Sequence, residues 1–285
     1  MAGRMHSTKH KRNAYAVAGV IEALLMVALV AVIISTIQLI YIPDIMEQKE
    51  AEHMDQISNQ FSSLKSMIDL QIISRSDAPI FSMITLGSRE LPYFISASAY
   101  GEVNVIDYGT SRIVVDEDEW QAVPLTSISY HAYNVYFVDQ TYILEGGGII
   151  VDQQNGIPVM RVDPGLTVDN STNVDVYMDL PMIYATEGKN FTYGLGKCFI
   201  RTNFSNTISY QNFTTISSNI KIYSTYPEAW FKSLNSTIGS MVDITLNPVG
   251  SPTHIRIEKK VGGKDIGLYI TQYPIYVQIG PGWIK

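Results

Sequence analysis

The strongest pattern in the sequence is a long hydrophobic stretch near its start. Residues 14–42 carry one charged residue, Glu22, and the run from Ala23 to Ile34 is wholly apolar. An apolar stretch of about 20 residues is long enough to cross a bilayer as a helix, whose backbone polar groups are satisfied internally. The pattern therefore predicts a transmembrane helix over 14–42.

A basic segment precedes this stretch and sets its expected orientation. Residues 1–13 contain no acid and carry four cationic side chains, those of Arg4, Lys9, Lys11 and Arg12. Basic flanks stay on the cytoplasmic side, which places residues 43–285 outside the cell. The alternative is a cleaved secretory signal, but its hydrophobic region spans about 7–15 residues and ends at a small-residue cleavage site. Pro43 and Asp44 follow instead, so we expect a retained, single-pass anchor in the cell membrane.

A helical pattern continues beyond the hydrophobic stretch. Residues 44–70 contain no Gly or Pro. Apolar residues recur there at spacings of three and four, which places them on one helix face; this apolar seam consists of Met54, Ile57, Phe61, Leu64 and Ile68. We expect one long helix over 14–70, with any bend near Pro43, and a helical stalk over 43–72. The seam packs either on the same chain's outer domain or on a neighbouring chain.

From residue 73 onward, apolar and polar residues alternate. Clear examples lie at 174–180, 220–222, 255–257 and 266–270. Short alternating runs separated by Gly and Asn turns are typical of antiparallel strands in a sandwich or barrel. The expected fold class is mainly β with a long N-terminal α-helix. Residues 73–285 form an extracellular antiparallel β-sandwich-type domain, either one large unit or two small ones divided near 163–172.

Two local signals refine this β domain. The triplet Gly146-Gly147-Gly148 separates two apolar runs and predicts a hairpin turn. Residues 227–238 instead read as a short helix, with Trp230, Phe231 and Leu234 facing the sheet.

Composition narrows the range of functions. The net charge of −7 argues against a general nucleic-acid binder, and the single cysteine, Cys198, excludes an internal disulfide framework or a multi-cysteine zinc site. We expect Cys198 to be a small buried apolar residue. Five N-x-S/T sequons all lie on the expected outer side, which favours a glycoprotein; they begin at Asn170, Asn190, Asn203, Asn212 and Asn235.

Catalytic and metal-binding patterns are weak. The sequence contains neither G-x-S-x-G nor H-E-x-x-H, and His53, His131 and His254 are expected to be structural or surface residues. We therefore expect no enzyme activity, no catalytic residue and no cofactor. Four consecutive acids are a weak Ca²⁺ candidate, better explained as a solvated loop because they lack the spaced ligands of an EF-hand; they are Asp116, Glu117, Asp118 and Glu119.

The tyrosines allow two interpretations. The group at Tyr130, Tyr133, Tyr136 and Tyr142 either packs in the core and across strands or forms an aromatic surface for sugars or protein partners.

The order of these segments resembles archaeal type IV pilin- and archaellin-like proteins, and in particular one uncharacterised archaeal family of membrane-anchored, pilin-like surface proteins. The resemblance covers about residues 14–235 and is one of order and spacing. Four segments carry it, namely 16–23, 41–44, 84–89 and 142–150. It implies architecture and a cell-surface location more than chemistry.

The resemblance also suggests a role for Glu22. In type IV pilins, a membrane peptidase cuts just before the apolar helix, and a Glu five residues into the mature chain pairs with a neighbouring subunit's N-terminal amine. Glu22 matches that position if the cut falls between Val17 and Ala18, although pilins favour Gly or Ala where Val17 stands. The alternative is that Glu22 lies close enough to the membrane interface to reach water.

Together these features predict a non-enzymatic, membrane-anchored surface protein that serves envelope structure, adhesion or filament assembly. Its expected partners are the lipid bilayer and other pilin-like subunits or surface glycans. The alternative is an outward-facing solute- or glycan-binding module on a membrane anchor; an extracellular hydrolase has no supporting residue set.

Overall fold

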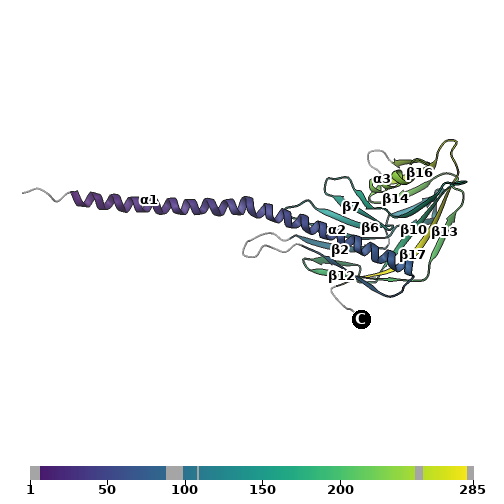
Figure 1. The fold of residues 1–285 in the computed structure, drawn as a ribbon, viewed down its shortest axis with the longest axis horizontal. Coiled ribbons are helices and arrows are strands. Elements are labelled where there is room, and N and C mark those ends of the chain that lie inside the picture. Colours follow the sequence, from purple (N-terminus) through teal and green to yellow (C-terminus); the bar gives the residue numbers. More distant parts are fainter. Residues whose placement is uncertain (1–6, 88–98, 108, 248–252, 281–285) are drawn as a thin grey trace, which may run out of the picture.

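A computed structural model describes residues 7–87, 99–107, 109–247 and 253–280, with side chains from residue 18 onward. Three helical segments follow one another without a break: α1 (Ser7–Thr36), the π-helical turn η1 (Ile37–Tyr41) and α2 (Ile42–Ser74). Figure 1 shows α1 projecting far beyond the strands, whereas α2 lies along them. The prediction of one long helix is confirmed, but the helix runs over 7–74 and so extends beyond the predicted 14–70 at both ends.

The π-helical turn marks the position of a proline. Pro43 lies in the first turn of α2, directly after η1. Proline has no N–H, and its ring crowds the carbonyl group four residues earlier in a regular helix. A π-helical turn widens the backbone locally, which allows the helix to continue past Pro43.

Seventeen strands in the described residues form three sheets. Sheet A has the order β1 (Ile80–Thr85), β12 (Lys197–Phe204), β17 (Ile266–Gly280), β10 (Val174–Ala185) and β9 (Gly165–Asp169), and β13 (Ser209–Phe213) also pairs with β17. Sheet B has the order β11 (Phe191–Gly194), β2 (Tyr100–Ile106), β5 (Ser127–Tyr133), β6 (Gln140–Glu145), β7 (Gly148–Gln153) and β8 (Val159–Val162). Sheet C has the order β15 (Val242–Asn247), β16 (His254–Lys259), β14 (Ile220–Tyr223), β3 (Arg112–Val115) and β4 (Asp118–Pro124).

One strand pair departs from the antiparallel prediction. β10 and β17 run parallel over twelve residue pairs, from Val174 opposite Ile266 to Ala185 opposite Val277. Alternation of apolar and polar residues identifies the faces of a strand but not its direction. The direction follows from the connection, and here strands β11 to β16 intervene and return the chain to the same end of the sheet.

Two hydrophobic clusters stabilise the β domain, by which we mean β1 to β17 with α3. The first lies among sheet C, helix α3 (Pro227–Ile238), the N-terminal parts of β10 and β17, and Ile143 and Ile150 of sheet B. The second joins α2, sheet B, β1, β12 and the C-terminal part of β17. Because β10 and β17 contribute residues to both clusters, these two strands connect one hydrophobic cluster to the other. The division near 163–172 stays a prediction.

The predicted hairpin and short helix meet at one contact. Gly146 and Gly147 form the turn between β6 and β7, with φ values of 55° and 80°, a conformation that favours glycine. A Cβ atom on Gly146 would lie 3.0 Å from the ring of Trp230, which is fully buried on α3. The hairpin at 146–148 and the helix over 227–238 are both confirmed.

Candidate functional site: the long helix and its junction with the β domain

The helix before α2 exposes apolar side chains all around its circumference. From residue 18 onward no residue of α1 is buried, and Leu25 and Val27 are each 66% exposed. Within the described residues, one helix is long and apolar enough to cross a membrane, and this exposed segment is its apolar part. Water solvates such a surface poorly, whereas lipid chains match it.

Glu22 lies within this exposed segment. Its carboxylate is the single charge between residues 14 and 42. The predicted pairing of Glu22 with a neighbouring chain stays a prediction.

The apolar seam packs on the same chain. All five of its residues are at most 2% exposed and belong to the second hydrophobic cluster, together with apolar residues of sheets A and B. The sequence allowed the seam to pack either on the same chain's outer domain or on a neighbouring chain, and in the structure it packs on the same chain. The face of α2 that carries the seam is occupied by the β domain.

A buried carboxylate fixes the N-terminal half of α2 to the β domain. Glu50 is fully buried and accepts hydrogen bonds from three successive backbone N–H groups, those of Val135, Tyr136 and Phe137, at 2.7–3.2 Å. These residues belong to the loop between β5 and β6. Successive N–H groups directed at one point form an anion-binding concavity, so Glu50 holds this loop against the helix.

His53 lies one turn further along α2 and is also buried. Its Nε2 atom is 3.4 Å from the hydroxyl oxygen of Tyr130, and that hydroxyl donates to the Leu86 carbonyl oxygen at 2.8 Å. Because the Tyr130 proton is used there, Nε2–H of His53 acts as the donor. Its Nδ1 atom is buried without a hydrogen-bond partner. Burial lowers the pKa of His53, which favours the neutral ring.

Two glutamines complete the junction. The amide of Gln60 accepts from the backbone N–H of Thr85 at 2.9 Å and donates to its hydroxyl at 3.0 Å, which ties α2 to β1. Gln71 is fully buried, and its amide nitrogen donates to the carbonyl oxygens of Ala78 and Thr202. Gln60 and Gln71, together with Glu50 and His53, therefore form hydrogen bonds to the β domain at intervals along the apolar seam; we call these bonds the polar locks.

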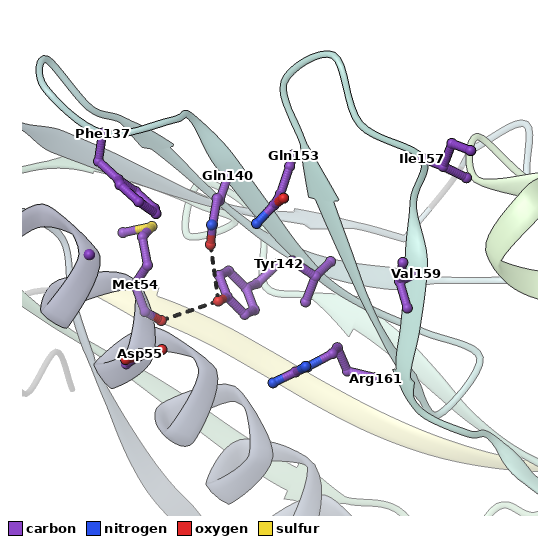
Figure 2. Close-up of a pocket in the computed structure, with 11 residues that line it drawn as sticks. Met54, Asp55, Phe137, Gln140, Tyr142, Gln153, Ile157, Val159 and Arg161 are labelled. Atoms are coloured by element: carbon purple, nitrogen blue, oxygen red, sulfur yellow. Dashed lines mark hydrogen bonds between the residues drawn. The ribbon is translucent and has the colours of Figure 1, made fainter. Parts of the chain in front are cut away.

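A pocket of about 470 Å³ opens where α2 meets the free edge of sheet B. Figure 2 shows Met54 and Asp55 on the helix facing Arg161 and the ring of Tyr142 across this space. The Tyr142 hydroxyl donates to the Met54 carbonyl oxygen and contacts the Gln140 amide oxygen, each at 3.2 Å. The tyrosine thereby binds helix to sheet, and the pocket places no nucleophile beside a base.

A second buried carboxylate joins sheet B to helix α3 and to the segment before that helix. Glu145, at the end of β6, accepts hydrogen bonds from the Ser224 hydroxyl at 2.6 Å and the Trp230 indole N–H at 2.8 Å. Burial raises the pKa of Glu145, and the hydroxyl and indole donors around it oppose that rise. This residue resembles Glu50 in being an acid held by donors from distant parts of the chain.

The four-acid run forms a hairpin turn and not a loop that gathers oxygens. Asp116 and Glu117 occupy the turn between β3 and β4 with positive φ values. Asp116 accepts from the backbone N–H groups of Ser217 and Ser218, Glu117 pairs with Lys221, Asp118 caps Trp120, and Glu119 pairs with Arg112. Among the described residues, no three acidic, His or Cys side chains are grouped so that they could hold a metal ion.

The remaining candidates occupy varied environments. Four sequon asparagines, Asn170, Asn190, Asn212 and Asn235, are exposed, whereas Asn203 is half-buried on β12. Cys198 is buried, as predicted, and burial raises its thiol pKa to about 12.

His131 and His254 lie on strands β5 and β16. Tyr130 and Tyr142 are buried, whereas Tyr133 and Tyr136 are half-buried.

Sequence reasoning missed Glu50, His53, Gln71 and Glu145 as junction residues. A signal was present for two of them. Glu50 and Gln71 extend the apolar seam at its own spacing, four residues before Met54 and three after Ile68. A polar residue at a position that the pattern buries must find a hydrogen-bond partner.

Comparison with models of known protein families, with curated proteins and with solved structures finds no match to this chain.

Proposed function

We propose that this chain is a single-pass membrane protein that holds a β domain outside the cell and serves envelope structure, adhesion or assembly with pilin-like subunits. In this proposal residues 1–13 lie in the cytoplasm and residues 14–42 span the membrane. The β domain is an extracellular sandwich-type module without enzymatic activity. Lipid is its first partner, and other surface subunits or glycans are further partners.

The observation that carries the proposal is the contrast along one unbroken helix. Apolar side chains are exposed all around α1, yet the same helix continues into α2, whose apolar seam is buried in the β domain. An exposed apolar surface of this length is costly in water and favourable in a bilayer. The unbroken helix then couples the anchor mechanically to the β domain.

Assembly with other subunits would have to use α1 and the exposed faces of the β domain, because the seam of α2 is already covered. A carboxylate such as Glu22 inside a membrane costs about 3 kcal/mol or more, and such residues usually have a partner. A neighbouring chain's N-terminus is the partner that the pilin resemblance implies. The four exposed sequon asparagines support a glycosylated surface.

Site-specific labelling tests the topology. Two single-cysteine additions are suitable: Trp120→Cys, at a side chain 99% exposed on β4, and Lys9→Cys, in the basic segment. The native Cys198 is buried and gives a low background. In intact cells that express the chain, a membrane-impermeant maleimide should label Trp120→Cys at once and Lys9→Cys only after permeabilisation.

The opposite labelling order, or recovery of the chain in the soluble fraction without detergent, would contradict the proposal. Alkaline carbonate washing provides the second measurement, because a spanning helix keeps the chain in the membrane pellet. The unaltered chain is the control for both.

A further inference from the structure

A second pocket, of about 420 Å³, lies on the face of sheet B that is turned away from α2. Its floor consists of side chains from β2, β5 and β6. The segment before α3, including Tyr226, and the residues before β3, including Ser111, form its walls. The volume falls within the range of about 300–1,000 Å³ that small-molecule sites occupy.

The floor is polar because three opposed residues form a row across the strands. Glu102 lies opposite His131, and His131 lies opposite Thr141. The Nδ1 atom of His131 is 2.7 Å from the Thr141 hydroxyl oxygen. Ser127 and Ser129 add two hydroxyl groups in the neighbouring rows. His131 and Thr141 satisfy each other in part, and the Glu102 carboxylate keeps acceptor sites for solvent or a ligand.

An aromatic pair borders the row. Tyr133 stacks on Tyr100 with ring centroids 4.5 Å apart, and the Glu102 carboxylate lies near its hydroxyl. Partial burial and that carboxylate together raise the pKa of Tyr133. The tyrosine is therefore neutral near pH 7, and its hydroxyl keeps a proton to donate.

The lining selects among ligand classes. No lysine or arginine lines the pocket in the described part of the chain, while Glu102 and Glu145 do, so an anionic ligand is disfavoured. An apolar ligand would exclude water from the Glu102 carboxylate without replacing the hydrogen bonds that water supplies. A neutral polyhydroxyl compound satisfies them, because each of its hydroxyl groups both donates and accepts.

We propose that this face of sheet B binds a short neutral saccharide, with Glu102, His131 and Thr141 as the polar contacts and Tyr133 as the aromatic border. The inference depends on the β domain alone, so it stands or falls independently of the membrane anchor. On an anchored surface protein it would provide a contact with sugars of the cell envelope or of another cell.

The test uses the full chain in dodecylphosphocholine micelles, because a maltoside or glucoside detergent would itself present a sugar. The probes are neutral hexoses, N-acetylhexosamines and their disaccharides, with spermidine as a cationic comparison, screened by saturation-transfer NMR and then titrated. Wild type should bind at least one of them saturably. The variants Glu102→Gln and His131→Ala should each bind about tenfold more weakly, the loss expected for one hydrogen bond to a charged or polar group.

Matched variants separate binding from folding. Tyr177→Ala alters a similar tyrosine stack, with Tyr269, on sheet A and should leave saccharide affinity unchanged. Thr141→Val keeps the side-chain shape of a sheet residue and should still weaken binding, with thermal unfolding confirming that the variant is folded. Absence of saturable binding by every probe, equal affinity in wild type and the floor variants, or binding of spermidine with no saccharide would each overturn the proposal.

Discussion

The two halves of the long helix, α1 and α2, differ in whether protein buries their apolar side chains. On α1 the apolar residues surround the helix and none of the described residues covers them, whereas on α2 they form one stripe that the β domain covers. On α2, polar residues within the stripe also bond to the β domain: the Glu50 carboxylate accepts from three backbone N–H groups, and the Gln71 amide nitrogen donates to two carbonyl oxygens. A long helix that is apolar all around its circumference is suited to lipid. A helix with one narrow apolar stripe, interrupted by hydrogen-bonded polar residues, is suited to packing against protein.

The largest effect should come from comparing the same substitution in both halves. Leu64→Ala removes a fully buried seam side chain and should lower the free energy of unfolding of the β domain by about 2–5 kcal/mol. Leu25→Ala, at a position 66% exposed on α1, should leave that free energy unchanged. Urea unfolding in detergent micelles, followed by fluorescence of the buried Trp230, measures both. Equal destabilisation by the two variants would contradict the comparison.

The next effect concerns the buried carboxylate. Glu50→Ala leaves three backbone N–H groups without their acceptor and should cost about 3 kcal/mol. Glu52→Ala, two residues away on the exposed side of α2, is the control and should have little effect. Glu50→Gln keeps one acceptor oxygen and should fall between them. If Glu50→Ala and Glu52→Ala behaved alike in the same urea assay, the proposed lock would be wrong.

A pH dependence should follow from His53. Burial lowers its pKa in the folded chain, so as the pH falls below roughly 6.5 the unfolded chain takes up the proton first. The free energy of unfolding should therefore fall with decreasing pH until the lowered pKa is passed, and be fully retained above pH 7. His53 also lines a pocket on the surface of α2, and the charged side chains that share this pocket with it are those of Lys49, Glu52 and Lys197.

Unfolding curves between pH 7.5 and 5 for wild type and His53→Gln measure this effect. The variant cannot titrate and should show a flatter profile. The slope that remains in it has contributions of opposite sign, because burial lowers the pKa of His254 and raises the pKa of Glu145. Identical slopes in wild type and variant would assign the pH dependence to other groups.

The smallest effect tests the lock to β1. Gln60→Ala removes two hydrogen bonds to Thr85 and should cost about 1 kcal/mol. Gln56 makes one long contact of 3.4 Å to the same hydroxyl from an exposed position, so Gln56→Ala should cost close to nothing. A larger loss in Gln56→Ala than in Gln60→Ala would reverse the assignment.

Much of the fold was predictable because local chemistry repeats along each element. The long helix, the hairpin at Gly146-Gly147, the helix over 227–238 and the buried Cys198 all follow from patterns within a few residues. The parallel pairing of β10 with β17 was not predictable in this way, since the partners are about ninety positions apart and their direction depends on the strands between them. The pocket over Glu102, His131 and Thr141 also joins segments from separate strands.

The sequence by itself determined that an apolar helix leads into an amphipathic one and then into strands, because hydrophobic periodicity acts between near neighbours. Only the tertiary structure decided what covers the apolar seam, which groups satisfy Glu50 and Glu145, and where polar side chains converge. Those outcomes depend on contacts between residues far apart in the chain, such as the 85 positions between Glu50 and Val135. Such pairs leave no periodic trace in the sequence.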